Sequence, residues 1–143
     1  MSNFSERLKE LMEDYNLSLV ELEQKIGVNH GNLSAYLSDK SLPVLNTLEK
    51  ILYFFNCSAD FILGLDEFPC EEKLYDLLPF GDRLRQILFE KKISQEKLKR
   101  ELPVSGSVLY KWITGKSSPV CSSLIKLATY LDCSVDYLIG RRR

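Results

Sequence analysis

The stretch that decides the fold is SQEKLKRELPVSGSVLYKWITGK, residues 94–116. It predicts two short helices separated by a turn. Ser94 can cap the first helix, because a serine hydroxyl at this position accepts a hydrogen bond from a backbone N–H of the first turn. Pro103 has no N–H and cannot continue a helix interior, so the chain must turn there. Ser105 can then cap the second helix.

The apolar residues of each predicted helix fall on one face. They are spaced i, i+4 in the first helix (Leu98, Leu102) and i, i+3, i+4 in the second (Leu109, Trp112, Ile113). The residues between the apolar positions of the second helix must face outward: Gly106, Ser107, Val108, Tyr110 and Lys111. This is a helix-turn-helix, and an outward face of small, hydroxylated and basic groups suits the DNA major groove.

The stretch resembles the Cro/C1-type (XRE) helix-turn-helix family of phage repressors. The resemblance rests on Ser94, Gln95, Leu98, Val104, Ser105, Leu109, Trp112, Gly115, Lys116 and Pro119. Two positions depart from the family pattern without removing the turn: Lys99 replaces the usual Ala, and Pro103 replaces the usual Gly. The resemblance implies that Gln95, Ser105 and Lys116 grip DNA phosphates. It places the five outward residues named above at base-facing positions.

The chain also repeats itself. Residues 4–64 align without a gap on residues 80–140. Matched pairs include Ser18 with Ser94, Leu22 with Leu98, Val28 with Val104, Leu33 with Leu109, Lys40 with Lys116 and Pro43 with Pro119. Such self-similarity over roughly 60 residues indicates two copies of one small domain.

Each copy is predicted to contain five helices. The first helices cover about 3–15 and 80–92, and the helix-turn-helix pairs cover 18–37 and 94–113. A fourth helix opens just after Pro43 or Pro119, since proline is favoured in a first turn. A last short helix is capped by Ser58 or Ser134 and stopped by Gly64 or Gly140. We therefore expect an all-α protein with two tandem lambda-repressor-like five-helix domains.

The expected domains are residues 1–65 and 80–143, and residues 66–79 form an acidic linker. Prolines mark the linker, which has room for one or two helical turns, and its cluster of Leu74, Tyr75, Leu77 and Leu78 is expected to pack on a domain. Fully extended, it reaches about 45 Å, more than the roughly 34 Å between successive half-sites on DNA. Binding of two sites by one chain is therefore geometrically allowed.

Charge separates the copies although the whole chain has a net charge of −1. Residues 4–65 carry five basic and nine acidic side chains, residues 66–79 carry one and five, and residues 80–143 carry thirteen and six. Phosphate neutralisation supplies most of the affinity in non-specific DNA binding. The second copy is therefore the expected DNA binder.

The first copy offers a weaker set of candidates for DNA contact. Its counterparts of the base-facing and phosphate-gripping residues are Asn29, His30, Gly31, Asn32, Ser34 and Lys40. Asn32 could pair with adenine. However, Leu19 replaces the family's phosphate-gripping Gln, and Glu23 stands at the small-residue position. This copy either binds DNA more weakly or serves as an interaction module.

Several residues also have a plain structural interpretation. Trp112 and Tyr36 have the spacing of core residues rather than of base-stacking aromatics. Arg83 and Arg85 could reach the DNA backbone or form a solvated face. The terminal arginines 141–143 could be a frayed tail or a phosphate clamp.

No other chemistry is indicated. The four cysteines show no CxxC spacing and there is one histidine, so we expect neither a metal site nor a cofactor. No catalytic constellation is recognisable, and enzymatic activity is not expected. No apolar run approaches a membrane span and no export signal is visible, so we expect a cytoplasmic protein.

The sequence thus predicts a regulator of transcription, a repressor, that binds double-stranded DNA in a sequence-specific manner through the second copy. The first copy would take an adjacent half-site or make a homodimer contact. The alternative is a protein-interaction module, like an antirepressor or antitoxin, in which the first copy binds little DNA. The sequence does not identify an operator or a small-molecule effector.

Overall fold

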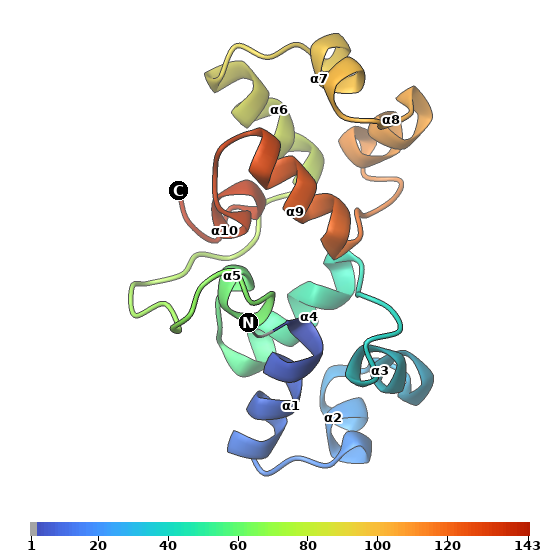
Figure 1. Cartoon of the computed structure of the whole chain (residues 1–143), viewed down its shortest axis with the longest axis vertical. Coiled ribbons are helices and arrows are strands. Elements are labelled where there is room, and N and C mark those ends of the chain that lie inside the picture. The colour runs from blue at the N-terminus through green and yellow to red at the C-terminus, as the bar shows by residue number, and fades with distance from the viewer. Residues whose placement is uncertain (1–2) are drawn as a thin grey trace. The chain divides into compact units, whose positions relative to one another are not determined.

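The computed structural model describes residues 3–143 (Figure 1). Contacts within the chain divide it into two compact units, Met1–Lys73 and Leu74–Arg143. In the described part each unit contains five α-helices, which confirms the expected all-α class. None of these ten helices is long and apolar enough to cross a membrane.

The helices of the first unit are α1 (Phe4–Asp14), α2 (Leu19–Ile26), α3 (His30–Leu37), α4 (Leu45–Phe55) and α5 (Ala59–Ile62). Those of the second unit are α6 (Phe80–Glu90), α7 (Gln95–Glu101), α8 (Gly106–Thr114), α9 (Cys121–Tyr130) and α10 (Val135–Ile139). The helix-turn-helix pairs are α2–α3 and α7–α8, at the predicted positions.

The polar caps follow the prediction closely. The Ser94 hydroxyl accepts a hydrogen bond from the third residue of α7 at 3.0 Å. In the first copy, Ser18 and Glu21 exchange side-chain and backbone hydrogen bonds in a complete capping box. The last helices, α5 and α10, are capped by Ser58 and Ser134.

Both units bury a core of leucine and isoleucine from all five helices. Fully buried side chains in the first unit include Leu8, Leu22, Leu33, Leu48, Ile51, Leu52 and Ile62. Those in the second unit include Leu84, Ile87, Leu98, Leu109 and Leu124. Tyr36 and Trp112 are also buried, as their spacing indicates.

The prolines lie outside the fourth helices, and the linker does not use its room for a helical turn. The fourth helices begin two residues after the prolines, with Val44 and Val120 as N-caps, so Pro43 and Pro119 lie ahead of the first turn and not in it. Residues 66–79 form no helix at all. A proline disfavours helical backbone at the residue before it, so neither helix extends back past Pro43 or Pro119.

Arg83 is a structural residue rather than a phosphate ligand or part of a solvated face. It is only 4% exposed, and its guanidinium donates to the carbonyls of Tyr137 and Arg142 at 3.0 and 3.4 Å. The same guanidinium lies 4.4 Å from the centroid of the Tyr137 ring. Arg7 repeats this arrangement over Phe61 in the first unit, 4.2 Å from its ring centroid. Each arginine therefore ties the first helix of its unit to the last.

The terminal arginines hold the end of the linker, so they are neither a frayed tail nor a free clamp. Tyr75 donates its N–H to the carbonyl of Arg141, and the Arg141 guanidinium donates to the Tyr75 carbonyl at 3.1 Å. Arg143 stacks on the Tyr75 ring and donates to the Asp76 carbonyl. The apolar end of the linker thus packs on the second unit, as expected.

Candidate nucleic-acid interface

The turn between α7 and α8 differs from its counterpart in the first copy. There, Gly27 ends α2 in the left-handed conformation, with φ of 71°. Pro103 stands at the equivalent position and has no N–H to donate, so α7 ends one residue earlier in the repeat, at Glu101. Instead, the N–H of Val104 donates to the carbonyl of Leu102 at 2.6 Å, forming a γ-turn around Pro103.

Close packing against α6 positions α8. Gly81 lies so near the backbone of Ile113 that an added Cβ would overlap the carbonyl oxygen and stand 2.8 Å from the Ile113 Cα. In the first copy Ser5 replaces this glycine, and its hydroxyl donates to the carbonyl of Leu37 at 2.7 Å. The helix that carries the candidate base-facing residues is therefore closely seated in the second copy.

The predicted outward face of α8 is exposed. Tyr110 is 56% and Val108 39% exposed, while Leu109 and Trp112 are buried on the opposite side. The other predicted base-facing residues are also exposed: Gly106, Ser107 and Lys111. A contiguous strip of α8 therefore faces solvent.

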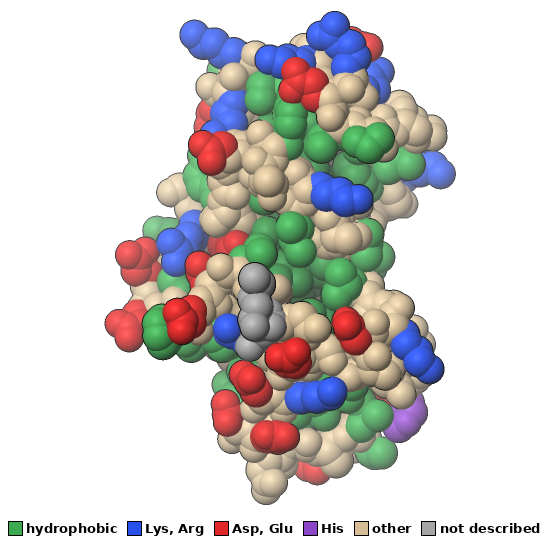
Figure 2. Space-filling model, in the orientation of Figure 1, with side chains coloured by type: hydrophobic (Ala, Val, Ile, Leu, Met, Phe, Trp, Pro, Cys, Tyr) green, Lys and Arg blue, Asp and Glu red, His purple; other side chains and the backbone are tan. Residues whose placement is uncertain are grey.

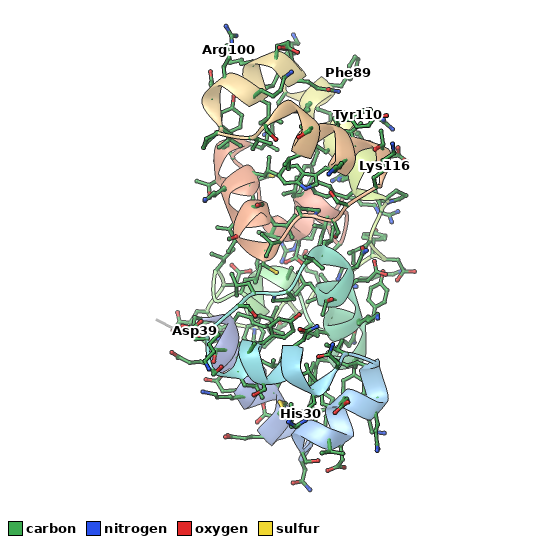
Figure 3. All side chains as sticks on the ribbon, turned by 90° about the vertical axis from the view of Figure 1, so that its right-hand side faces the viewer. His30, Asp39, Phe89, Arg100, Tyr110 and Lys116 are labelled. Carbon is green, nitrogen blue, oxygen red and sulfur yellow. The ribbon has the colours of Figure 1, made fainter. Side chains whose placement is uncertain are left out.

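The predicted phosphate-gripping residues are exposed as well. Gln95 is exposed at the first position of α7, and Lys116 is exposed just past the end of α8. The Lys116 ammonium lies 5.1 Å from the ring centroid of Tyr110. Both residues are labelled in Figure 3. Ser105 is exposed too, but its hydroxyl accepts from the N–H of Val108, so its first role is to cap α8.

Basic side chains gather over α7 and its surroundings in the second unit (Figure 2). The Lys99 stem lies beside Gly106, and a Cβ added to this glycine would stand 3.8 Å from the Lys99 Cδ, an ordinary contact distance. The Lys99 ammonium is 2.8 Å from the Glu96 carboxylate, and this hydrogen bond lowers the pKa of Glu96. The lysine that replaces the family's alanine is thus paired with a glutamate of the same helix.

The equivalent surface of the first copy has a different chemistry. Glu23 and His30 face each other at 3.6 Å where the second copy has Lys99 and Gly106. Asn29 caps α3 through its side-chain oxygen, which accepts from the N–H of Asn32 at 2.8 Å. The remaining candidates are exposed: Gly31, Asn32, Ser34 and Lys40.

Sequence reasoning missed three features of these surfaces. Val20, beside Leu19 at the start of α2, is 54% exposed and makes this end of the helix apolar. Asp39 takes the left-handed φ of 60° and places a carboxylate where the second copy has Gly115. Phe89 is 86% exposed at the end of α6 (Figure 3). The repeat alignment identifies the first two features. It pairs the apolar Val20 with the charged Glu96, and the acidic Asp39 with the neutral Gly115.

The described residues contain no candidate metal centre. Among residues 3–143 no three His, Cys, Asp or Glu side chains are grouped so that they could hold an ion. The cysteines in this range form no disulfide, and burial raises the pKa of Cys121 to about 12.

Comparison with known proteins places both units in one family. The family model for the Cro/C1-type HTH DNA-binding domain matches residues 7–66, and a helix-turn-helix family model matches residues 83–138. A search of solved structures found no significant match.

Two curated relatives come from Bacillus subtilis (strain 168). The uncharacterized HTH-type transcriptional regulator YobD is 29% identical over 66 residues, which are 46% of this chain and 59% of the relative. The HTH-type transcriptional regulator ImmR is 34% identical over 65 residues, 46% of this chain and 51% of the relative. The chain therefore spans between half and three fifths of the length of these relatives. From the two family matches and the repeated five-helix fold, the chain belongs to the Cro/C1-type helix-turn-helix family and carries two copies of its domain.

Proposed function

We propose that this protein is a sequence-specific regulator of transcription that represses by laying α8 in the major groove of double-stranded DNA. One observation carries the proposal: α8 buries Leu109 and Trp112 while it exposes a strip of small, hydroxylated and basic residues. Such a helix has one face in the core and one face exposed to solvent. The exposed face has the composition of a recognition helix that lies in the major groove.

Within this proposal the phosphate contacts fix the register of α8. Gln95 donates from the start of α7, and Lys116 donates from just beyond the end of α8. The ring of Tyr110 supports the Lys116 ammonium through a cation–π contact.

The base contacts then follow from side-chain chemistry. Lys111 is suited to the O6 and N7 acceptors of guanine, and Val108 is suited to the methyl group of thymine. Ser107, whose hydroxyl lies 3.2 Å from that of Ser105, can donate to either kind of base. The preferred half-site of the second copy should therefore contain both G and T.

A charge reversal in the strip tests the proposal. In the full chain, Lys111→Glu combined with Lys116→Ala should weaken binding to a selected duplex by at least about 100-fold, since it removes two contacts and adds a repulsive charge. Binding is measured by fluorescence anisotropy on a duplex selected from a random library. The control, Lys126→Glu with Lys91→Ala, makes the same change in net charge at exposed lysines outside α8. Equal losses in both double variants would refute the assignment.

A second role is favoured for the first copy, namely contact with a protein. Its helix-turn-helix surface combines the exposed Val20 and half-buried Leu19 with the carboxylates of Glu23 and Asp39. Apolar groups and carboxylates oppose DNA phosphates but suit a protein partner, including a second copy of the chain. Sedimentation of the full chain at low salt and at about 1 M salt tests this role. Apolar association between copies of the chain persists at high salt, whereas association driven by DNA phosphates is screened.

A further inference from the structure

In both copies the fifth residue of the first helix of the helix-turn-helix reaches the start of the second helix. The Lys99 ammonium lies 3.9 Å from the position that a Cβ on Gly106, the first residue of α8, would occupy. In the first copy the Glu23 carboxylate lies 3.6 Å from Nδ1 of His30, the first residue of α3. The side chain at this position therefore brings a charge to the start of the second helix, and that charge is positive only in the second copy.

Lys99 also shares a face of α7 with Gln95. The two residues are spaced i, i+4 in this helix, so their side chains lie one turn apart on the same side. Gln95 is a proposed phosphate contact, and Gly106 begins the exposed strip of α8. Lys99 is thus a neighbour of both parts of the proposed DNA interface.

The ammonium of Lys99 is paired with a carboxylate that can leave it. Its Nζ lies 2.8 Å from Oε1 of Glu96, one turn earlier in α7. The Lys99 side chain is 31% exposed, whereas the Glu96 side chain is 80% exposed, so the lysine stem is packed and the glutamate is not. An ion pair of this kind within one helix contributes little to stability. Another anion can therefore replace the carboxylate without any loss of packing.

We propose that Lys99 is a further phosphate contact of the second copy and that Glu96 competes with DNA for it. The inference rests on the proposed binding of DNA by α7 and α8. In the free protein the ammonium donates to Glu96, and in the complex it donates to an oxygen of the DNA backbone. The phosphate wins the exchange because its neutralisation releases condensed counterions from the duplex. Glu96 thus reduces the affinity of the second copy for DNA.

The salt dependence of binding tests the phosphate contact in the full chain. On a duplex selected from a random library, Lys99→Gln should reduce the slope of log affinity against log salt by about 0.9 in magnitude. Affinity for a duplex of unrelated sequence should fall by a similar factor, because a phosphate contact carries no sequence information.

The matched control is Lys97→Gln. Lys97 lies in the same helix and is also paired with a glutamate, Glu101, at 4.0 Å. It is two residues from Lys99, and therefore about 200° away around the helix. The same loss of charge there should leave the slope unchanged.

The competition is tested by freeing the ammonium. Glu96→Gln should tighten binding at least about threefold, since it removes the anion that occupies Lys99. When Lys99→Gln is already present, the same change should tighten binding by no more than about 1.5-fold, because no ammonium is released. The control Glu101→Gln should leave the affinity of the parent chain unchanged. Circular dichroism verifies that each variant is folded.

The inference is overturned if Lys99→Gln leaves the slope unchanged, if Lys97→Gln reduces it as much, or if Glu96→Gln gives equal gains with and without Lys99. Its failure is distinguishable from that of the proposed function. If only this inference fails, the parent chain still binds the selected duplex and the variant with Lys111→Glu and Lys116→Ala still loses it. If the proposed function fails, that double variant loses no more affinity than its control.

Discussion

Asp39 shows how one residue can oppose both stability and DNA contact in the first copy. It occupies the left-handed region at φ of 60°, where side chains other than glycine are strained, and the second copy places Gly115 there at φ of 77°. Its carboxylate adjoins Lys40, the counterpart of the phosphate-gripping Lys116. The backbone at this position is the same in both copies, but the chemistry presented beside it is not.

Replacing Asp39 with glycine should therefore stabilise the first unit by about 0.5–1 kcal/mol, because the relief of backbone strain exceeds the extra freedom that glycine gains on unfolding. Urea denaturation followed by circular dichroism measures the change. The control is Asp39→Asn, which removes the charge but keeps a side chain that tolerates this conformation, and it should shift the unfolding midpoint much less. A glycine variant less stable than the parent would contradict the argument.

At the scale of elements, the contact between α6 and α8 leaves no room for a Cβ atom at Gly81. Gly81→Ala adds a methyl group that must overlap the Ile113 carbonyl, so α8 has to move or α6 has to tilt. We expect a loss of about 1–3 kcal/mol in unfolding free energy and weaker DNA binding, since α8 carries the proposed base contacts.

The matched control for this prediction is Gly31→Ala. Its new Cβ would meet only the Asn29 side-chain oxygen, at an ordinary 3.5 Å, so alanine should be neutral or slightly stabilising in α3. If Gly81→Ala costs no more unfolding free energy than Gly31→Ala, the close packing of α8 on α6 does not matter for stability.

Local sequence signals predicted the elements better than their connections. The serine caps, the apolar spacings of α7 and α8 and the repeat register placed all ten helices, because each signal acts over a few neighbouring residues. The burial of Arg83 and Arg141 could not be predicted, since both are held by carbonyls that lie 54 or more residues away in the chain.

At the scale of the whole molecule, the two copies differ more in charge than in fold. Basic residues outnumber acidic ones by seven in residues 80–143, and acidic residues outnumber basic ones by four in residues 4–65. A duplication that preserves the helices and divides the charge gives each copy a different affinity for a polyanion. Dependence of DNA binding on salt should therefore come almost entirely from the second copy.

Paired neutralisations at the matched lysines test this division. Binding of the full chain to a selected duplex is measured over a range of salt concentrations, and the slope of log affinity against log salt is compared among variants. Lys116→Gln should reduce the magnitude of the slope by about 0.9, the value for one lost phosphate contact. Lys40→Gln removes the same charge from the equivalent position of the first copy and should leave the slope unchanged, because Asp39 and Glu23 make that surface unfavourable for phosphate. A reduction of about 0.9 in both variants would mean that the two copies grip DNA alike. The acidic copy would then be a second reader rather than a surface for a protein partner.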